Sequence, residues 1–220
     1  MNENVIAENY QNVIGDIAKT LKYINDPDRK VNLIAVSKTV PADGIFPLLQ
    51  KGHRIFGENR VQEAKEKWTP LKTKFPDIEL HMIGPLQRNK VKDAVHIFDV
   101  IETVASLQLA EDLKNECEKQ KKNIRFFAQV NTGEEEQKSG LKPHDLDAFL
   151  EKCPLTISGL MCIPPINDEP SVHFHMLAMM AKKHGIPHLS MGMSSDYCEA
   201  VMLGADYIRV GSKIFGERRK

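Results

Sequence analysis

Leu33-Ile34-Ala35-Val36-Ser37-Lys38-Thr39-Val40-Pro41 joins an apolar run to a lysine, a turn and a proline. Four apolar residues in a row predict a buried strand, and Lys38 follows close to its carboxyl end. Lysine is almost never fully buried unless it pairs with an opposite charge or has a chemical role. A partly buried amine loses its proton more easily, which suits it to attack a carbonyl. Taken alone, the stretch favours an ordinary lysine that reaches solvent from a strand end.

The rest of the chain alternates between short apolar runs and amphipathic segments. An amphipathic helix is expected over residues 3–24, ahead of the lysine strand. Further helices are expected over 41–50, 60–74, around 85–90, around 109–117, and over 143–152, 169–184 and 194–203. Strands are expected at 33–36, 54–57, 79–83, 97–101, 124–130, 155–161, 188–190 and 206–210.

Strands that alternate with helices imply parallel pairing. Eight such units in 220 residues predict an α/β fold, a single (β/α)8 TIM-type barrel with an extra N-terminal helix. An open doubly wound sheet remains the alternative, because counting strands from a pattern can be wrong by one or two. There is no internal repeat or long linker, so residues 1–220 are expected to form one domain.

Composition narrows the class of function. Lys plus Arg and Asp plus Glu each number 30, a balance that gives no support for a nucleic-acid or membrane-surface partner. The four cysteines show neither a C-x-x-C pair nor a zinc-ligand spacing, so no metal site and no disulfide framework is predicted. The amino end does not resemble a signal peptide, and no run approaches 18 apolar residues. A cytoplasmic protein is the expectation.

Small and polar residues collect where the predicted strands end. In a barrel of this kind the active face is built at the carboxyl ends of the strands. Turn residues also collect at strand ends for purely structural reasons. The richest ends are Lys38, Gly57-Glu58-Asn59, Ile83-Gly84-Pro85, Asn131-Thr132-Gly133, Gly192-Met193-Ser194-Ser195 and Arg209-Val210-Gly211-Ser212.

The last two strand ends suggest an anion site. Met193-Ser194-Ser195 is expected to open a helix, with serine as its cap and backbone N–H groups left over for an anion. Gly211 allows close approach of a ligand, and Ser212 adds a hydroxyl. Barrels often bind phosphate with the loops after strands seven and eight. A plain helix cap and a plain turn are the alternative interpretation of these two loops.

A lysine able to form an imine, a phosphate cradle and Arg209 together suit pyridoxal 5′-phosphate (PLP). Several motifs in register carry a more specific resemblance: Val36-Ser37-Lys38-Thr39-Val40-Pro41, Phe56-Gly57-Glu58-Asn59, Ile83-Gly84-Pro85-Leu86-Gln87-Arg88-Asn89-Lys90, Gly192-Met193-Ser194 and Ile208-Arg209-Val210-Gly211-Ser212-Lys213-Ile214-Phe215-Gly216. With these motifs the chain resembles the YggS/PROSC family, the pyridoxal phosphate homeostasis proteins.

The resemblance implies a barrel similar to the N-terminal domain of alanine racemase, with PLP as an aldimine on Lys38. It implies that Arg209 faces the pyridine nitrogen and that Asn59 lies beside the ring. By the same resemblance, Ser194, Gly211 and Ser212 hold the phosphate, and Val36 and Met193 complete the cofactor site. Two positions depart from the family. Arg60 stands where tyrosine is common, which puts that tyrosine's role in doubt, and Ser212 stands where threonine is common, which keeps the hydroxyl.

Three functions remain open: a protein that holds PLP and passes it to PLP-dependent apoenzymes, an amino-acid racemase, and a phosphate-binding barrel in which Lys38 is incidental. A guanidinium stays protonated, with a pKa above about 12, so Arg209 would leave the ring nitrogen unprotonated and the cofactor a weak electron sink. Racemases of similar fold take a second acid/base, a tyrosine, from a C-terminal β domain. Because the chain ends at Lys220, no such domain is expected, and Tyr197 is the only tyrosine retained as a candidate. A monomeric PLP-binding protein without catalytic residues is therefore predicted.

Overall fold

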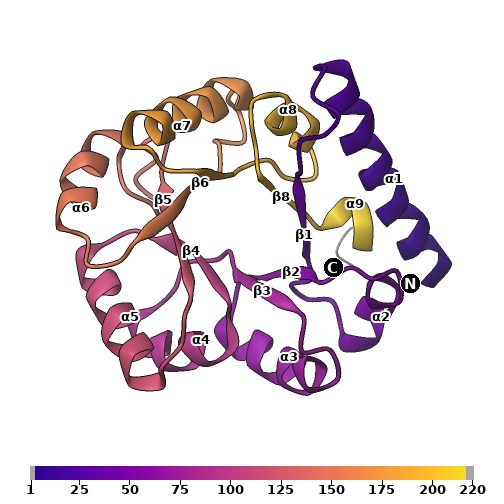
Figure 1. Cartoon of the computed structure of the whole chain (residues 1–220), viewed down its shortest axis with the longest axis horizontal. Coiled ribbons are helices and arrows are strands. Elements are labelled where there is room, and N and C mark those ends of the chain that lie inside the picture. Colours follow the sequence, from indigo (N-terminus) through magenta and orange to yellow (C-terminus); the bar gives the residue numbers. More distant parts are fainter. Residues whose placement is uncertain (1–2, 217–220) are drawn as a thin grey trace.

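Eight parallel strands close into a barrel in the order β1 to β8 (Figure 1). The computed structural model describes residues 3–216; residues 1–2 and 217–220 of the predicted 1–220 domain lie outside the described residues. The strands are β1 (Asn32–Val36), β2 (Ile55–Glu58), β3 (Glu79–Met82), β4 (Val100–Val104), β5 (Arg125–Val130), β6 (Ile157–Cys162), β7 (His188–Ser190) and β8 (Tyr207–Val210). Since β1 pairs with both β2 and β8, the sheet has no open edge. The predicted (β/α)8 barrel is confirmed, and the open sheet is excluded.

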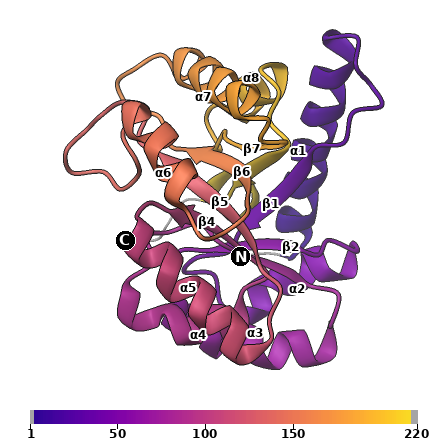
Figure 2. The same cartoon turned by 60° about the vertical axis from the view of Figure 1, so that its left-hand side comes forward.

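Helices surround the strands on the outside (Figure 2). They are α1 (Glu3–Tyr23), α2 (Ala42–Gln50), α3 (Val61–Lys74), α4 (Val91–Ile97), α5 (Leu107–Gln120), α6 (Leu146–Lys152), α7 (Pro170–His184), α8 (Tyr197–Met202) and α9 (Ser212–Phe215), with 3-10 turns at Arg88–Lys90 and Pro143–Asp145. The extra helix α1 packs beside α2, α8 and α9 (Figure 1). Within residues 3–216, no helix combines the length and apolarity needed to cross a membrane.

The apolar side chains form two clusters, one on each face of the barrel wall. Successive side chains of a strand point to opposite faces. Leu33 and Ala35 belong to the large cluster between the strands and the helices, whereas Ile34 belongs to a small cluster with side chains from β4, β5, β6 and β8. The small cluster therefore lies inside the barrel. It shares that interior with buried polar side chains, which are described below.

The structure differs from the prediction in one strand and two helices. The strand expected at 97–101 runs from Val100 to Val104, because Ile97 ends α4 and Phe98 packs its ring into the outer core. An apolar run across a helix end and a strand start does not reveal where one passes into the other. The helix expected over 194–203 begins only at Tyr197, and the four-residue helix α9 was not predicted.

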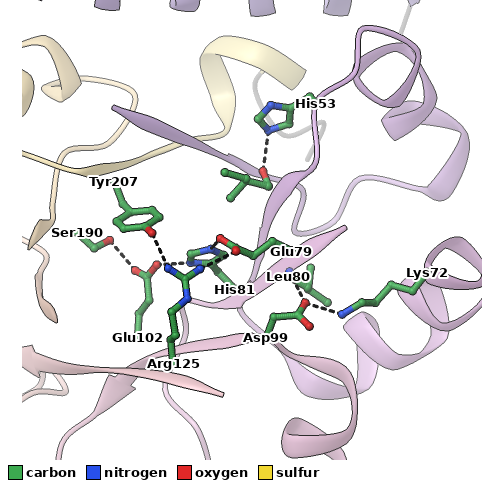
Figure 3. A network of polar contacts seen from close by, with 11 residues as sticks. His53, Lys72, Glu79, Leu80, His81, Asp99, Glu102, Arg125, Ser190 and Tyr207 are labelled. Carbon is green, nitrogen blue, oxygen red and sulfur yellow. Dashed lines mark hydrogen bonds and ion pairs between the residues drawn. The ribbon is translucent and has the colours of Figure 1, made fainter. Parts of the chain in front are cut away.

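His53 is a buried histidine beside α1 and offers a test of the packing. Its side chain lies 2.7 Å from the carbonyl of Ile55 through Nε2 (Figure 3). Burial lowers the pKa of His53 from 6.5 to about 4, the hydrogen bond to Ile55 opposes this fall, and the charge of Arg54 adds to it. The folded protein thus keeps this imidazole neutral at a pH where the unfolded chain would protonate it.

We predict that the free energy of unfolding falls as the pH drops from 6.5 toward 4. In this range His53 binds a proton in the unfolded state but stays neutral in the folded state. His53 should contribute a loss of about 2 kcal/mol by pH 5. Urea denaturation at pH 7 and pH 5 should show a smaller loss in His53→Gln than in the wild type. The exposed His175→Gln is the control and should follow the wild type. Equal losses in all three proteins would contradict this role of His53.

Candidate functional site

One cavity of about 970 Å³ opens at the carboxyl ends of the strands. Its walls come from the loops after β1, β2, β3, β6, β7 and β8 and from the start of α1. All eight residues predicted for the cofactor site line this cavity: Val36, Lys38, Asn59, Met193, Ser194, Arg209, Gly211 and Ser212. The structure thus brings together residues that are far apart in the sequence.

Lys38 lies in a tight turn directly after β1. The N–H of Val40 donates to the carbonyl of Ser37 at 3.0 Å, which closes the turn around Lys38 and Thr39. Lys38 is half-buried and lines the cavity. Thr39 has φ of 65°, a left-handed conformation that is a genuine outlier for a β-branched residue. Such a residue costs roughly 1–3 kcal/mol and persists only where its surroundings enforce it.

A buried ion pair on the outer side of the barrel holds the residue before Lys38. Lys67 of α3 donates to the carbonyl of Ser37 at 2.7 Å and pairs with Glu58 at 3.0 Å. The Ser37 hydroxyl donates to the same Glu58 oxygen at 2.7 Å, and so does the Trp68 indole N–H at 3.0 Å. Burial raises the pKa of Glu58, while the charge of Lys67 and these hydrogen bonds oppose the rise.

Glu63 holds the residue after Lys38. Its carboxylate accepts the N–H of Thr39 at 2.6 Å and pairs with Lys67 at 2.9 Å. The backbone on both sides of Lys38 is therefore anchored to α3 by charged groups. These contacts supply the surroundings that enforce the unusual conformation of Thr39.

Asn59 is placed by a close approach of two loops. A Cβ built on Gly84 would lie 2.4 Å from the carbonyl oxygen of Asn59, closer than any side chain allows. Glycine at position 84 therefore lets the loop after β3 pack directly on the loop after β2. Asn59, half-buried, lines the cavity beside Ile83.

The loops after β7 and β8 are joined at the cavity. The Ser194 hydroxyl oxygen accepts the N–H of Gly211 at 3.2 Å. A Cβ on Gly211 would lie 3.2 Å from the carbonyl oxygen of Val36, so glycine at this position allows the loop after β8 to pack closely against the end of β1. The expected serine cap is wrong: Ser194 lies in a turn, and Asp196 occupies the N-cap position of α8. The Asp196 carboxylate accepts the N–H of Met193 at 2.5 Å instead.

Arg209 projects from β8 and is only 4% exposed. It donates through Nη1 to the Ser190 hydroxyl at 2.6 Å and through Nη2 to the carbonyl of Cys162 at 2.7 Å. Glu102 lies behind Ser190, with its carboxylate 4.0 Å from Nη1. The guanidinium is thus held from inside the barrel, and Arg209 is also one of the residues that line the cavity.

Charges around the cavity favour an anion. Three cationic residues line it, Lys38, Arg209 and Lys213, against two acidic ones, Glu3 and Asp43. The Lys213 ammonium lies 4.8 Å from the centre of the Tyr197 ring. With the hydroxyls of Ser194 and Ser212, these groups can bind a phosphorylated compound, and Lys38 can react with a carbonyl carbon.

Tyr197 does not reach the cavity, so its retention as an acid/base candidate was wrong. Its hydroxyl donates to Asp16 of α1 at 2.7 Å, and the side chain is 1% exposed. Burial raises the pKa of Tyr197, and the hydrogen bond to Asp16 adds to the rise. Among residues 3–216 no tyrosine lines the cavity. Arg60, where the resemblance leads us to expect a tyrosine, is exposed and lies outside the cavity lining.

Several residues that position the site were missed from the sequence. Glu102 was placed beyond the end of its strand because the strand was expected to stop at 101, and Ser190 was treated as part of a short strand only. A polar residue inside an apolar strand, as in Val100-Ile101-Glu102, was the available signal. Lys67 and Glu63 offered none, since they read as members of a charged, solvated helix.

Comparison with known proteins identifies the family. Residues 15–219 match the family described as alanine racemase, N-terminal domain. The pyridoxal phosphate homeostasis protein of Pasteurella multocida is 34% identical over 227 aligned positions, which cover 97% of this chain and 97% of that protein. This chain belongs to the pyridoxal phosphate homeostasis protein family.

Solved structures agree with this assignment. PipY of Synechococcus elongatus without PLP superposes with a TM-score of 0.84 at 36% identity, covering 96% of this chain and 100% of that one. Its form with PLP bound gives 0.77 at 37% identity, over 91% and 100%. Alanine racemase of Clostridium difficile gives 0.70 at 13% identity, over 97% of this chain and 58% of that one, a likeness of fold alone.

We predict that Lys67→Met lowers the free energy of unfolding by about 3 kcal/mol, because it leaves Glu58 buried without its cation. The matched control is Lys65→Met on the same helix, which removes a pair with Asp93 whose side chains are 47% and 35% exposed. An exposed pair of that kind should cost less than about 1 kcal/mol. Urea denaturation of both variants measures the difference. Equal losses would contradict the anchoring of the Lys38 turn by Lys67.

Proposed function

We propose that this protein binds PLP in the cavity, with the cofactor attached to Lys38, and takes part in PLP homeostasis or transfer. The observation that carries the proposal is the convergence on one cavity of Lys38, the buried Arg209 and the two loops joined through Ser194 and Gly211. The PLP-bound structure of PipY, with which this fold superposes, supports it.

The residues present fit the chemistry of PLP. The cofactor supplies an aldehyde that condenses with a primary amine and releases water, so attachment to Lys38 requires no other reactant. Ser194, Gly211 and Ser212 are the proposed phosphate ligands. Two serine side chains supply hydroxyls, and Gly211, which has no side chain, lets a ligand approach the backbone. Asn59, with Val36 and Met193, is assigned to the walls beside the ring.

Arg209 is assigned to the pyridine nitrogen. A guanidinium donates hydrogen bonds but does not give up its proton at physiological pH, so it would leave that nitrogen unprotonated. Such a site retains imine exchange and disfavours reactions through a carbanion. The racemase alternative requires a second acid/base, and no observation favours it: Tyr197, its candidate, does not line the cavity, and its hydroxyl donates to Asp16 of α1.

The same proposal includes the partners and the compartment. PLP-dependent apoenzymes are the proposed recipients, because an imine can exchange from one lysine to another without net redox change. We propose that the protein acts as a monomer, because the eight residues assigned to the cofactor already converge on one cavity of a single barrel. A cytoplasmic location is supported by four cysteines that are all free thiols.

We predict that the purified protein incubated with PLP shows an absorbance band at about 420 nm, the region expected for PLP joined to a lysine. Lys38→Ala should lack this band because the reacting amine is removed. Lys114→Ala, an exposed lysine on α5, is the matched control and should keep it. A wild-type protein that takes up no PLP would overturn the proposed function.

Two further measurements separate the alternatives. A loaded holder of PLP should reactivate an apoenzyme and should not exchange the α-proton of alanine in deuterated water. Exchange that depends on Lys38 would favour the racemase. Binding of inorganic phosphate without any uptake of PLP would favour the phosphate-binding barrel.

A further inference from the structure

A network of buried polar side chains runs through the interior of the barrel and ends at Arg209. Figure 3 shows the part of this network that lies between Ser190 and Tyr207. From Arg209 it passes to Ser190, from the Ser190 hydroxyl to Glu102 Oε2 at 2.6 Å, and from Glu102 Oε1 to His81 Nδ1 at 2.6 Å. Ser190, Glu102 and His81 are each 0% exposed. The middle of this network is therefore out of reach of water.

The far end of the network lies at the opposite face of the barrel, near the starts of β3 and β5. His81 Nε2 lies 2.8 Å from Glu79, whose other oxygen pairs with Arg125 at 2.6 Å. Arg125 in turn donates to the Tyr207 hydroxyl at 2.7 Å. Along this series of contacts the charges alternate in sign. Arg209, His81 and Arg125 are positive, and Glu102 and Glu79 are negative.

The geometry determines which groups are charged. An ionised carboxylate only accepts hydrogen bonds, so a histidine with a carboxylate on each nitrogen carries both protons. Burial lowers the pKa of His81, but the hydrogen bonds and charges of Glu102 and Glu79 outweigh it and raise the pKa overall. Burial raises the pKa of Glu102, but His81 and Arg209 outweigh it and hold the pKa below its usual value. Glu102 is therefore an anion enclosed by the barrel.

The negative charge of Glu102 determines the direction in which the Ser190 hydroxyl donates its hydrogen bond. A hydroxyl has one proton to donate, and at Ser190 it goes to Glu102. The Ser190 oxygen is then committed as an acceptor for Arg209 Nη1. Together with the Cys162 carbonyl, this acceptor holds two guanidinium N–H groups on the inner side. These two contacts leave the remaining N–H groups of Arg209 unused, and Arg209 lines the cavity.

We propose that Glu102 is a positioning residue for the cofactor: acting through Ser190, it fixes the orientation of the Arg209 guanidinium and balances its charge from behind. This inference deepens the proposed function and rests on it. Glu102 is not itself among the residues that line the cavity. It determines which donors Arg209 can present to a heteroaromatic nitrogen in the cavity, and it keeps that arrangement the same before and after the ligand binds.

Glu102→Gln and Ser190→Ala test the proposal. Glutamine keeps the shape of Glu102 and removes its charge, whereas alanine at 190 removes the hydroxyl and leaves the Glu102–His81 pair in place. Asp99→Asn is the matched control. Asp99 is a carboxylate that accepts from Lys72 at 2.5 Å and from the N–H of Leu80 at 2.8 Å, outside this chain of contacts (Figure 3).

The first readout needs no cofactor. Nitrogen NMR of the arginine side chains in the unliganded protein, with the Arg209 signal assigned from Arg209→Lys, reports rotation of the guanidinium. We expect rotation to be about tenfold faster in both variants, since Ser190→Ala removes the acceptor of Arg209 Nη1 and Glu102→Gln removes the negative charge that orients this acceptor. Asp99→Asn should match the wild type.

The second readout uses PLP itself. Both variants should still attach PLP through Lys38, but with a dissociation constant roughly tenfold higher and with a shifted visible band, which a merely structural role would not produce. Unchanged rotation, affinity and band in a folded Ser190→Ala would overturn the role of Glu102 while the proposed function stands. A wild-type protein that takes up no PLP would overturn the proposed function itself. A loss of stability shared with Asp99→Asn, with PLP binding unchanged, also counts against Glu102.

Discussion

Arg209 is a permanent positive charge inside a β-barrel, and the interior is built around that constraint. Taking an ion out of water costs several kcal/mol even after relaxation, unless partners surround it. Barrels of this fold usually fill their interior with layers of branched apolar side chains. Here the apolar cluster around Ile34, Phe127 and Tyr207 occupies only part of the space. The rest holds Ser190, Glu102 and His81, which stabilise the charge that β8 carries inward.

Two separate clusters support the two halves of the site. The turn that carries Lys38 is held from outside the barrel wall by Lys67, Glu58 and Glu63 of β2 and α3. The guanidinium of Arg209 is held from inside by Ser190 and Glu102. Because β1 and β8 are neighbours, with Ile34 opposite Arg209 in register, the two supports act on adjacent strands of one closed sheet. A shift of either strand would change the spacing of the lysine and the arginine.

The parts of the site that follow from strand ends were predictable from the sequence. Parallel strands in a barrel bring their carboxyl ends to one face, so Lys38, Asn59, Ser194 and Gly211 converge once eight strands are recognised. Contacts across the fold were not predictable. The partner of Ser194 is a backbone N–H in another loop, and the partner of Tyr197 is Asp16, nearly the whole chain away. Glu102 was missed because the strand was predicted to end at residue 101. An apolar run does not show where a helix ends and the next strand begins.

A site that holds a reactive aldehyde and a site that turns over amino acids need different groups. Turnover needs side chains that gain and lose protons, with pKa values near the working pH. Arg209 cannot do so, and the groups that hold it are committed: the Ser190 proton to Glu102, and both His81 protons to carboxylates. The tyrosines, which could serve as acids, are engaged elsewhere or exposed. What the barrel presents to the cavity is a fixed array of donors together with the amines of Lys38 and Lys213, an arrangement that fits the proposed retention and release of a cofactor.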